Sequence, residues 1–170
     1  MATLRPGRSY SKITKKPNTR ISIHKPRKSY VKGVPATKIH QFEMGAKGDY
    51  PLSMDLVCRN NVQIRSNALE AARITTLKYL TKKLGDTGFF FKVLVYPHHV
   101  LRQNSIATGA GADRYSQGMA KSFGKPIGQA ARVKIGQNVM RISAPKNSEA
   151  VVREALKRAS KKLPGTFLIK

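Results

Sequence analysis

The beginning of the chain is basic and contains no acidic residue. No Asp or Glu precedes Glu43, and few large apolar side chains occur in the same stretch. Prolines recur along it, at Pro6, Pro17, Pro26 and Pro35. Such a segment cannot bury enough surface to offset the entropy of ordering it. Residues 1–38 are therefore predicted to form an extended basic arm that a partner orders, and residues 39–170 a single folded domain.

The charge of the whole chain indicates a polyanionic partner. The 33 Lys and Arg residues outnumber the 8 Asp and Glu residues, which gives a formal net charge of +25. Repulsion among like charges weakens the compact state, whereas RNA phosphates reverse that effect and release counterions. RNA is therefore the predicted partner, and a solvated, unbound arm is the alternative. The predicted RNA-binding residues are Arg5, Arg8, Lys12, Lys15, Lys16, Arg20, Lys25, Arg27, Lys28, Lys32, Arg73, Lys121, Lys125 and Arg132.

Cysteine content and hydropathy suggest a compartment. Cys58 is the only cysteine, so no intrachain disulfide forms, and a free thiol in an apolar run suits a reducing compartment. The N-terminus lacks the apolar stretch of a secretory signal, and no window is apolar for long enough to cross a bilayer. Its composition resembles that of an organelle transit peptide, but its prolines disfavour the amphipathic helix that such a peptide needs. A cytoplasmic protein without membrane contact is expected.

The first half of the domain is predicted to contain two strands and a helix. Residues 39–44 alternate in polarity and residues 52–64 resume an extended pattern, so both are predicted strands. The helix that follows has Asn67 and Glu70 as a capping box and ends at Gly85. Its apolar stripe comprises Leu69, Ala72, Leu77, Leu80 and Leu84, and its outer face carries Arg73, Lys78, Lys82 and Lys83.

The second half alternates strands with one further helix. Residues 89–96 are aromatic and β-branched, which predicts a central, mostly buried strand, and residues 98–102 form a shorter extended piece. Residues 131–135 and 139–142 alternate around a turn and predict a β-hairpin. A second helix begins after Asn147 or Ser148, and residues 166–169 form a last strand. The predicted inner stripe of this helix is Val151, Val152, Ala155, Leu156 and Ala159.

These elements together predict the fold class. Strands and helices that follow one another in this order give an α+β fold, a two-layer α/β sandwich with a mixed or antiparallel sheet. Its two main helices are expected on one face of the sheet. The arm extends from this body.

A long connection separates two of the predicted strands. Residues 103–128 contain recurrent glycines and no periodic apolar face, and a connection of this length in a compact domain is usually functional or disordered. Arg102, Arg114, Lys121 and Lys125 surround or occupy it, and Tyr115 offers a stacking face. Solvated loop charges are the alternative. The predicted flexible loop covers residues 103–118.

The sequence contains no arrangement typical of catalysis. The glycines of 109–113 are not followed by the Lys-Ser/Thr of a phosphate loop. His98 and His99 lack a recognised metal spacing with Cys58, and the aspartates show no pairing at a spacing typical of acid-base work. We therefore expect no enzymatic activity, no cofactor and no metal site.

Several ordered motifs resemble a known family. They are Tyr96-Pro97-His98-His99-Val100-Leu101-Arg102, Gly109-Ala110-Gly111-Ala112-Asp113-Arg114, Gln117-Gly118-Met119, Phe123-Gly124-Lys125-Pro126 and Ala130-Ala131-Arg132-Val133. Together they resemble the archaeal and eukaryotic ten-e family of large-subunit ribosomal proteins, the counterpart of bacterial large-subunit protein sixteen. The resemblance covers nearly the whole chain. Because the chain ends shortly after Phe167, without the longer tail associated with eukaryotic members, the archaeal branch is favoured.

The resemblance implies a hammerhead-type α/β sandwich in the large ribosomal subunit. It implies that ribosomal RNA is the main partner, with neighbouring ribosomal proteins, and that no self-oligomer forms. It further implies a loop that faces the A-site tRNA near the peptidyl transferase centre. The residues of this loop are Arg102, Gln103, Gly109, Gly111, Asp113, Arg114 and Tyr115. A free RNA chaperone or DNA-binding architectural protein and an RNA-modifying enzyme are the competing hypotheses.

Overall fold

Two antiparallel sheets organise the chain in the computed structural model, which describes residues 5–13, 31–107 and 109–170. The five-stranded sheet has the order β1-β4-β7-β2-β8 and the three-stranded sheet the order β3-β6-β5. The first comprises β1 (Glu43–Gly45), β2 (Leu52–Cys58), β4 (Phe90–Val93), β7 (Asn138–Ala144) and β8 (Phe167–Ile169). The second comprises β3 (Val62–Arg65), β5 (His99–Gln103) and β6 (Lys125–Val133).

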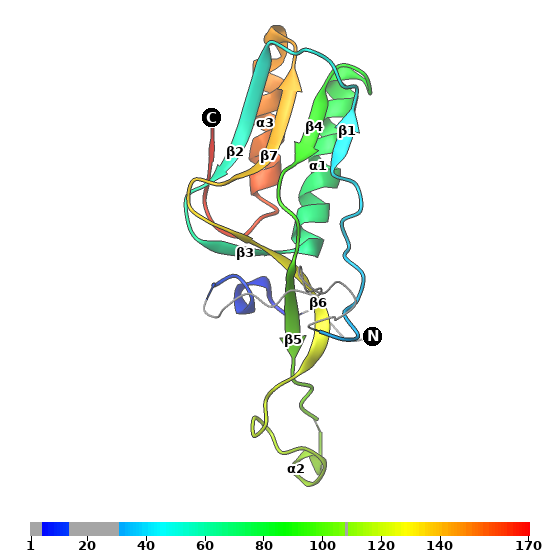
Figure 1. Ribbon diagram of the computed structural model, residues 1–170, viewed down its shortest axis with the longest axis vertical. Helices are drawn as coiled ribbons and strands as arrows, with labels where there is room; N and C mark the ends of the chain where they lie inside the picture. Colours follow the sequence, from blue (N-terminus) through cyan, green and yellow to red (C-terminus); the bar gives the residue numbers. More distant parts are fainter. Residues whose placement is uncertain (1–4, 14–30, 108) are drawn as a thin grey trace, which may run out of the picture.

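Two long helices cover one face of the five-stranded sheet. They are α1 (Ser66–Leu84) and α3 (Glu149–Ser160), which pack against each other (Figure 1). Shorter pieces are α2 (Ala112–Tyr115), η1 (Gly7–Ser9) and η2 (Lys146–Ser148). This arrangement confirms the predicted α+β two-layer class with two main helices. No helix in the described ranges combines the length and apolarity that a bilayer crossing requires.

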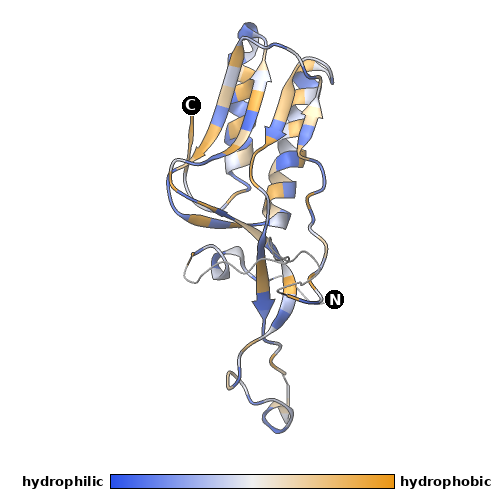
Figure 2. Ribbon diagram, in the orientation of Figure 1, coloured by the Kyte–Doolittle hydropathy of each residue, from blue (hydrophilic) through white to orange (hydrophobic). Residues whose placement is uncertain are grey.

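The hydrophobic core lies between this sheet and the two helices. Phe89, Phe91 and Ile142 are fully buried from the sheet side, and Leu80 and Leu156 from the helix side. Orange and blue segments alternate along the strands in Figure 2, as expected of a sheet that buries one face. In α3 the predicted stripe is confirmed for Val152, Ala155, Leu156 and Ala159, whereas Val151 is only partly buried.

The chain crosses from one sheet to the other three times between strands that follow one another directly. The pairs are β2–β3, β4–β5 and β6–β7. Residues 59–61, Pro97 and the turn after Val133 lie at the three crossings. The small sheet therefore extends away from the sandwich, and the chain between β5 and β6 projects from its far end (Figure 1).

The predicted hairpin of 131–135 and 139–142 is wrong as a pairing. The turn exists, since Gln137 N donates to Lys134 O at 3.2 Å. However, β6 pairs with β3 and β5, whereas β7 pairs with β2 and β4. Cys58, at the end of β2, bonds to this turn: it accepts from Gly136 N at 2.8 Å and donates to Gln137 O at 3.0 Å. The backbone N–H of Gly136 and the carbonyl of Gln137 are therefore bonded to β2 and not across a hairpin.

Other boundaries also differ from the predictions. The extended run 52–64 is two strands in different sheets, β1 covers only Glu43–Gly45, and β6 begins at Lys125 inside the predicted connection. The segment predicted to be a central strand forms β4, which lies second from one edge of the sheet, whereas β7 is the central strand. Only alternate residues of β4 are buried.

The capping predictions are also corrected. Helix α1 ends before Gly85 as predicted, where φ is 73°. Ser148, one of the two predicted cap residues, is the N-cap residue of α3. However, neither α1 nor α3 has a side-chain cap hydrogen bond in the described residues. The predicted capping box is wrong because α1 begins at Ser66 with Arg65 as its N-cap residue, which places Asn67 inside the helix. The carboxylate of Glu70 binds Arg73 instead.

Candidate nucleic-acid interface

The described N-terminal segment, residues 5–13, is fixed to β3 by hydrogen bonds that its main-chain oxygens accept. Arg65 Nη1 donates to Arg5 O, Gln63 Nε2 donates to Tyr10 O, and Gln63 N donates to Ser11 O, each at 2.8 Å. These bonds use main-chain oxygens and leave the side chains of this segment available. Accordingly, the predicted RNA-binding residues Arg5, Arg8 and Lys12 are all exposed.

The rest of the basic arm is only partly described. Lys15, Lys16, Arg20, Lys25, Arg27 and Lys28 lie outside the described residues. Beyond them, Val31 is buried, Gln129 Nε2 donates to Pro35 O at 3.2 Å, and Lys32 is exposed. Both described ends of the arm therefore contact the body.

The placement of Arg73 on the outer face of α1 is wrong. Its side chain is 10% exposed, and its Nη2 lies 2.6 Å from Glu70 Oε1. Nη1 donates to Gln41 Oε1 at 3.0 Å. The hydrogen bonds between Arg73 and Glu70 raise the pKa of Arg73 and lower the pKa of Glu70. The chain before β1 covers this part of the helix, so Arg73 supports the fold from within.

Arg132 lies on β6 and is partly buried. Its Nε donates to Gln63 Oε1 at 3.3 Å, which places it beside the N-terminal segment. The neighbouring His99 has a pKa lowered by burial and then by the positive charge of Arg132. Arg132 and His99 line a cavity of about 590 Å³ with Tyr96 and Lys134. The region is thus basic and partly apolar.

The connection between β5 and β6 is clamped at its base. Arg102 Nη1 donates to Gly124 O at 2.9 Å, and the guanidinium lies 4.2 Å from the centroid of the Phe123 ring. Asn104 Nδ2 donates to Gly118 O at 3.2 Å. A Cβ at Gly124 would collide with the backbone of Gln103, so only glycine permits this approach. Arg102 therefore positions the loop as well as carrying a charge.

The far part of the loop is exposed. Gly109 and Gly111 have positive φ values of 129° and 73°, and α2 carries Asp113, Arg114 and Tyr115. Tyr115 is 89% exposed and Phe123 is 80% exposed. Lys121 and Lys125 are also exposed. The structure thus places Arg102 and Gln103 at the base of one projection and the other predicted loop residues along it.

An exposed aromatic group was not predicted from the sequence. The rings of Phe42 and Tyr96 stack with centroids 5.4 Å apart, and His98 lies 4.6 Å from Tyr96. The signal was the alternation past β4, where Val93, Val95 and Pro97 are buried and Leu94, Tyr96 and His98 are exposed. Tyr96 and His98 are exposed, whereas Phe42 is partly buried against the core. Exposed aromatic rings beside basic residues are typical of single-stranded RNA recognition.

The ion pairs of the described residues lie away from the exposed cations of the N-terminal segment and the loop. Six ion pairs form in this part of the chain, and they engage Glu43, Asp55, Glu70, Glu149 and Glu154. None of them includes an exposed cation of the N-terminal segment or the loop. Two lysines lower the pKa of Glu43 to about 2. Within the described ranges no cluster of three potential metal ligands occurs. The arrangement suits an extended polyanion.

Comparisons with known proteins agree with this chemistry. The family model described as ribosomal protein L16p/L10e matches residues 18–170. The large ribosomal subunit protein uL16 of Staphylothermus marinus is 48% identical over 162 residues, covering 95% of this chain and 89% of that protein. The uL16 of Methanocella arvoryzae is 45% identical over 166 residues, covering 97% and 92%. That of Archaeoglobus fulgidus is 45% identical over 139 residues, covering 81% and 80%.

The match spans the body, the loop and most of the arm, and these relatives confirm the predicted archaeal affinity. An enzymatic role is excluded by the same assignment, since the family consists of structural ribosomal components. The chain therefore belongs to the ribosomal protein L16p/L10e family and is a structural constituent of the large ribosomal subunit.

Proposed function

We propose that the chain binds ribosomal RNA of the large subunit through its N-terminal segment, arm and basic loop, and that the loop helps to position A-site tRNA. The carrying observation is the projection between β5 and β6, which exposes Arg114 and Tyr115 on a base held by Arg102. A projection that makes no core contribution, yet is anchored firmly, suits a loop that acts on a partner.

The N-terminal segment supports the ribosomal RNA part of the proposal. Its backbone is held by β3 while Arg5, Arg8 and Lys12 remain exposed, so its cations are presented at fixed positions. Phosphate contacts of this kind give affinity that does not depend on sequence and that falls with salt. Neighbouring ribosomal proteins are further expected partners.

RNA binding is tested by neutralising two of these cations. The double variant Arg8→Gln/Lys12→Gln should reduce the slope of log affinity against log salt by about 0.7 to 0.9 for each phosphate that the segment no longer neutralises. The measurement is a salt titration of binding to a large-subunit RNA fragment. Lys83→Gln is the control, because it removes a positive charge from the end of α1, away from the segment. An unchanged slope in the double variant would show that the segment does not contact phosphate.

The tRNA-facing role is tested in assembled large subunits. Deletion of 107–112 removes part of the exposed projection but no core residue, so the protein should fold and incorporate fully. Subunits carrying it should bind A-site tRNA more weakly or form peptide bonds more slowly than wild type. Full occupancy with wild-type values in both assays would leave the loop with a structural role only. Sedimentation with the large subunit at moderate salt separates this protein from a free RNA chaperone, which would dissociate.

A further inference from the structure

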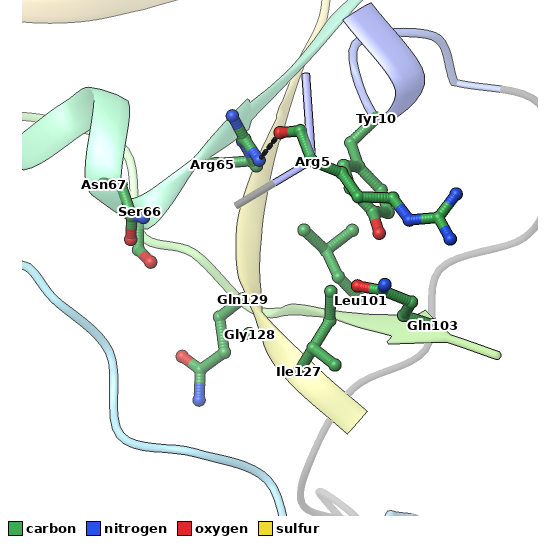
Figure 3. A pocket seen from close by; sticks show the side chains of 10 residues that line it. All are labelled: Arg5, Tyr10, Arg65, Ser66, Asn67, Leu101, Gln103, Ile127, Gly128 and Gln129. Carbon is green, nitrogen blue, oxygen red and sulfur yellow. Dashed lines mark hydrogen bonds between the residues drawn. The ribbon is translucent and has the colours of Figure 1, made fainter. Parts of the chain in front are cut away.

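A pocket lies where the N-terminal segment, the start of α1 and the strands β5 and β6 meet. Its volume is about 270 Å³. Figure 3 shows Arg65 and Tyr10 on one side of it and Leu101, Ile127 and Gln129 on the other. The hydrogen bond from Arg65 to Arg5 O, drawn there as a dashed line, holds the N-terminal segment as one wall. The segment thus closes a hollow on the small sheet.

The lining combines an apolar surface with cations. Leu101 and Ile127 offer aliphatic surface, and Tyr10 offers an aromatic ring. Arg65 lies over that ring, with its guanidinium carbon 5.7 Å from the centroid, and Arg5 adds a second positive charge. No carboxylate occurs among the described residues that line the pocket. A ligand with a flat ring and a negative charge suits both features.

Gly128 leaves the floor of the pocket open. A Cβ built at this position meets no heavy atom within 4 Å, although Gly128 belongs to β6 and pairs with Leu101. The φ of Gly128 lies outside the positive range that favours glycine. Backbone conformation therefore does not require glycine here, in contrast to the close approach at Gly124. A side chain at position 128 would instead occupy space that is open to a ligand.

The start of α1 supplies donors at another wall. Ser66 and Asn67 line the pocket, and the helix has no side-chain cap hydrogen bond among the described residues. First-turn backbone N–H groups and the helix dipole both favour a negatively charged oxygen. This wall adds to the attraction of Arg5 and Arg65 for an anion. The aliphatic and aromatic walls would not be needed for a phosphate alone.

We propose that this pocket holds one unstacked nucleotide of RNA, and this proposal rests on the ribosomal RNA binding proposed above. The base enters between Tyr10 and the aliphatic floor, and its phosphate lies toward Arg5 and Arg65. Gln103 provides an amide group for the edge of the base, whereas the amide of Gln129 already donates to Pro35 O. Pockets for drug-sized ligands span roughly 300 to 1,000 Å³, so a volume of about 270 Å³ suits a single nucleotide better than a larger cofactor.

The proposal is tested by chemical probing of RNA in large subunits assembled with wild-type or variant protein. Gly128→Val fills the pocket from the floor, with a side chain that strands favour. Ser53→Val is the matched control, because it introduces the same side chain at an exposed position of β2, in the other sheet. Tyr10→Leu removes the aromatic face while leaving the backbone bonds of the segment in place. Base-specific methylation and 2′-hydroxyl acylation report on each nucleotide.

One nucleotide should be protected in wild-type and Ser53→Val subunits and become about tenfold more reactive with Gly128→Val, with other protections unchanged. Tyr10→Leu should expose the same nucleotide, because the base can no longer stack on the ring. Gly128→Ala, with one added methyl group in open space, replaces the valine variant if valine prevents folding. Identical reactivity with wild-type, pocket-filled and Tyr10→Leu proteins would overturn the proposal while leaving RNA binding intact. A wild-type protein that protects no nucleotide would instead refute the proposed RNA binding.

Discussion

Substitution of Arg102 by serine should loosen the loop without unfolding the domain. The arginine donates to Gly124 O at 2.9 Å and contacts the Phe123 ring, and both partners belong to the returning end of the loop. Neither contact involves the core between the five-stranded sheet and the helices. The destabilisation is therefore expected to be local.

The magnitude follows from the two contacts. A hydrogen bond from a charged donor contributes about 1.5 to 3 kcal/mol, and a cation–π contact to an exposed ring about 0.5 to 1 kcal/mol. Against this, Arg102 Nε is buried without a hydrogen-bond partner among the described residues, and this cost disappears with the side chain. A net destabilisation of about 1 to 2 kcal/mol raises the population of the open loop about 5- to 30-fold.

Hydrogen exchange measures this population. Amides at the end of β5 and the start of β6 should exchange faster by that factor in Arg102→Ser, while amides of β4 and β7 should not change. Arg114→Ser is the matched control, since it removes an equal charge from the exposed part of the same loop. Equal protection in the two variants would refute the clamp. It would leave Arg102 as one cation among the others.

Two further predictions concern stability of the isolated protein. Leu156→Ala should lower the free energy of unfolding by about 2 to 5 kcal/mol because the Leu156 side chain is fully buried. Leu77→Ala should lower it less because Leu77 is only partly buried, and Lys83→Ala, at an exposed position, should leave it unchanged. Equal thermal stability of the three variants would contradict these placements. The ion pair with Arg73 lowers the pKa of Glu70 in the folded protein below its ordinary value of 4.5. The stability that this ion pair adds is therefore fully present above pH 4.5 and is lost as the pH falls through the folded-state pKa of Glu70. The difference in melting temperature between wild type and Glu70→Gln should therefore shrink on acidification, and a constant difference would contradict it.

The sequence predicted those elements whose signals are local. Helix α1 has an apolar period and ends at Gly85, and both can be read without knowing the neighbours. Phe91 in β4 and Phe89 just before it both point into the core, as the alternation predicts. The exposed glycine-containing loop was predictable for the same reason, because the absence of an apolar face is itself a local property.

The errors concern partners that are distant in the chain. Alternation in β6 and β7 reports that both are strands, but Cys58, some 80 residues earlier, bonds to the turn between them. Arg73 stands four residues after Leu69, on the buried face of α1, and its charge alone suggested the outer face. Gln41, from the chain before β1, accepts a hydrogen bond from the Arg73 guanidinium there. Periodicity gives the direction of a side chain along its own element, whereas burial also depends on what packs there.

The same limit applies to the candidate site. Residue type alone identified the exposed cations Arg5, Arg8 and Lys12, since dense positive charge needs no fold to attract phosphate. The pocket beside Tyr10 could not be predicted, because it needs three segments of the chain to meet. The clamp at Gly124 likewise depends on the close return of the loop to Gln103.

The three-stranded sheet joins these features into one mechanical unit. Its strand β3 holds the N-terminal segment, β6 carries Gly128, and β5 ends at the clamp of the loop. Antiparallel pairing of β6 with both neighbours connects the N-terminal segment on β3 to the base of the loop on β5. On the proposed function, Arg8→Gln/Lys12→Gln should therefore weaken A-site tRNA binding by assembled large subunits even though every loop residue is intact, and wild-type tRNA affinity in that variant would contradict this coupling.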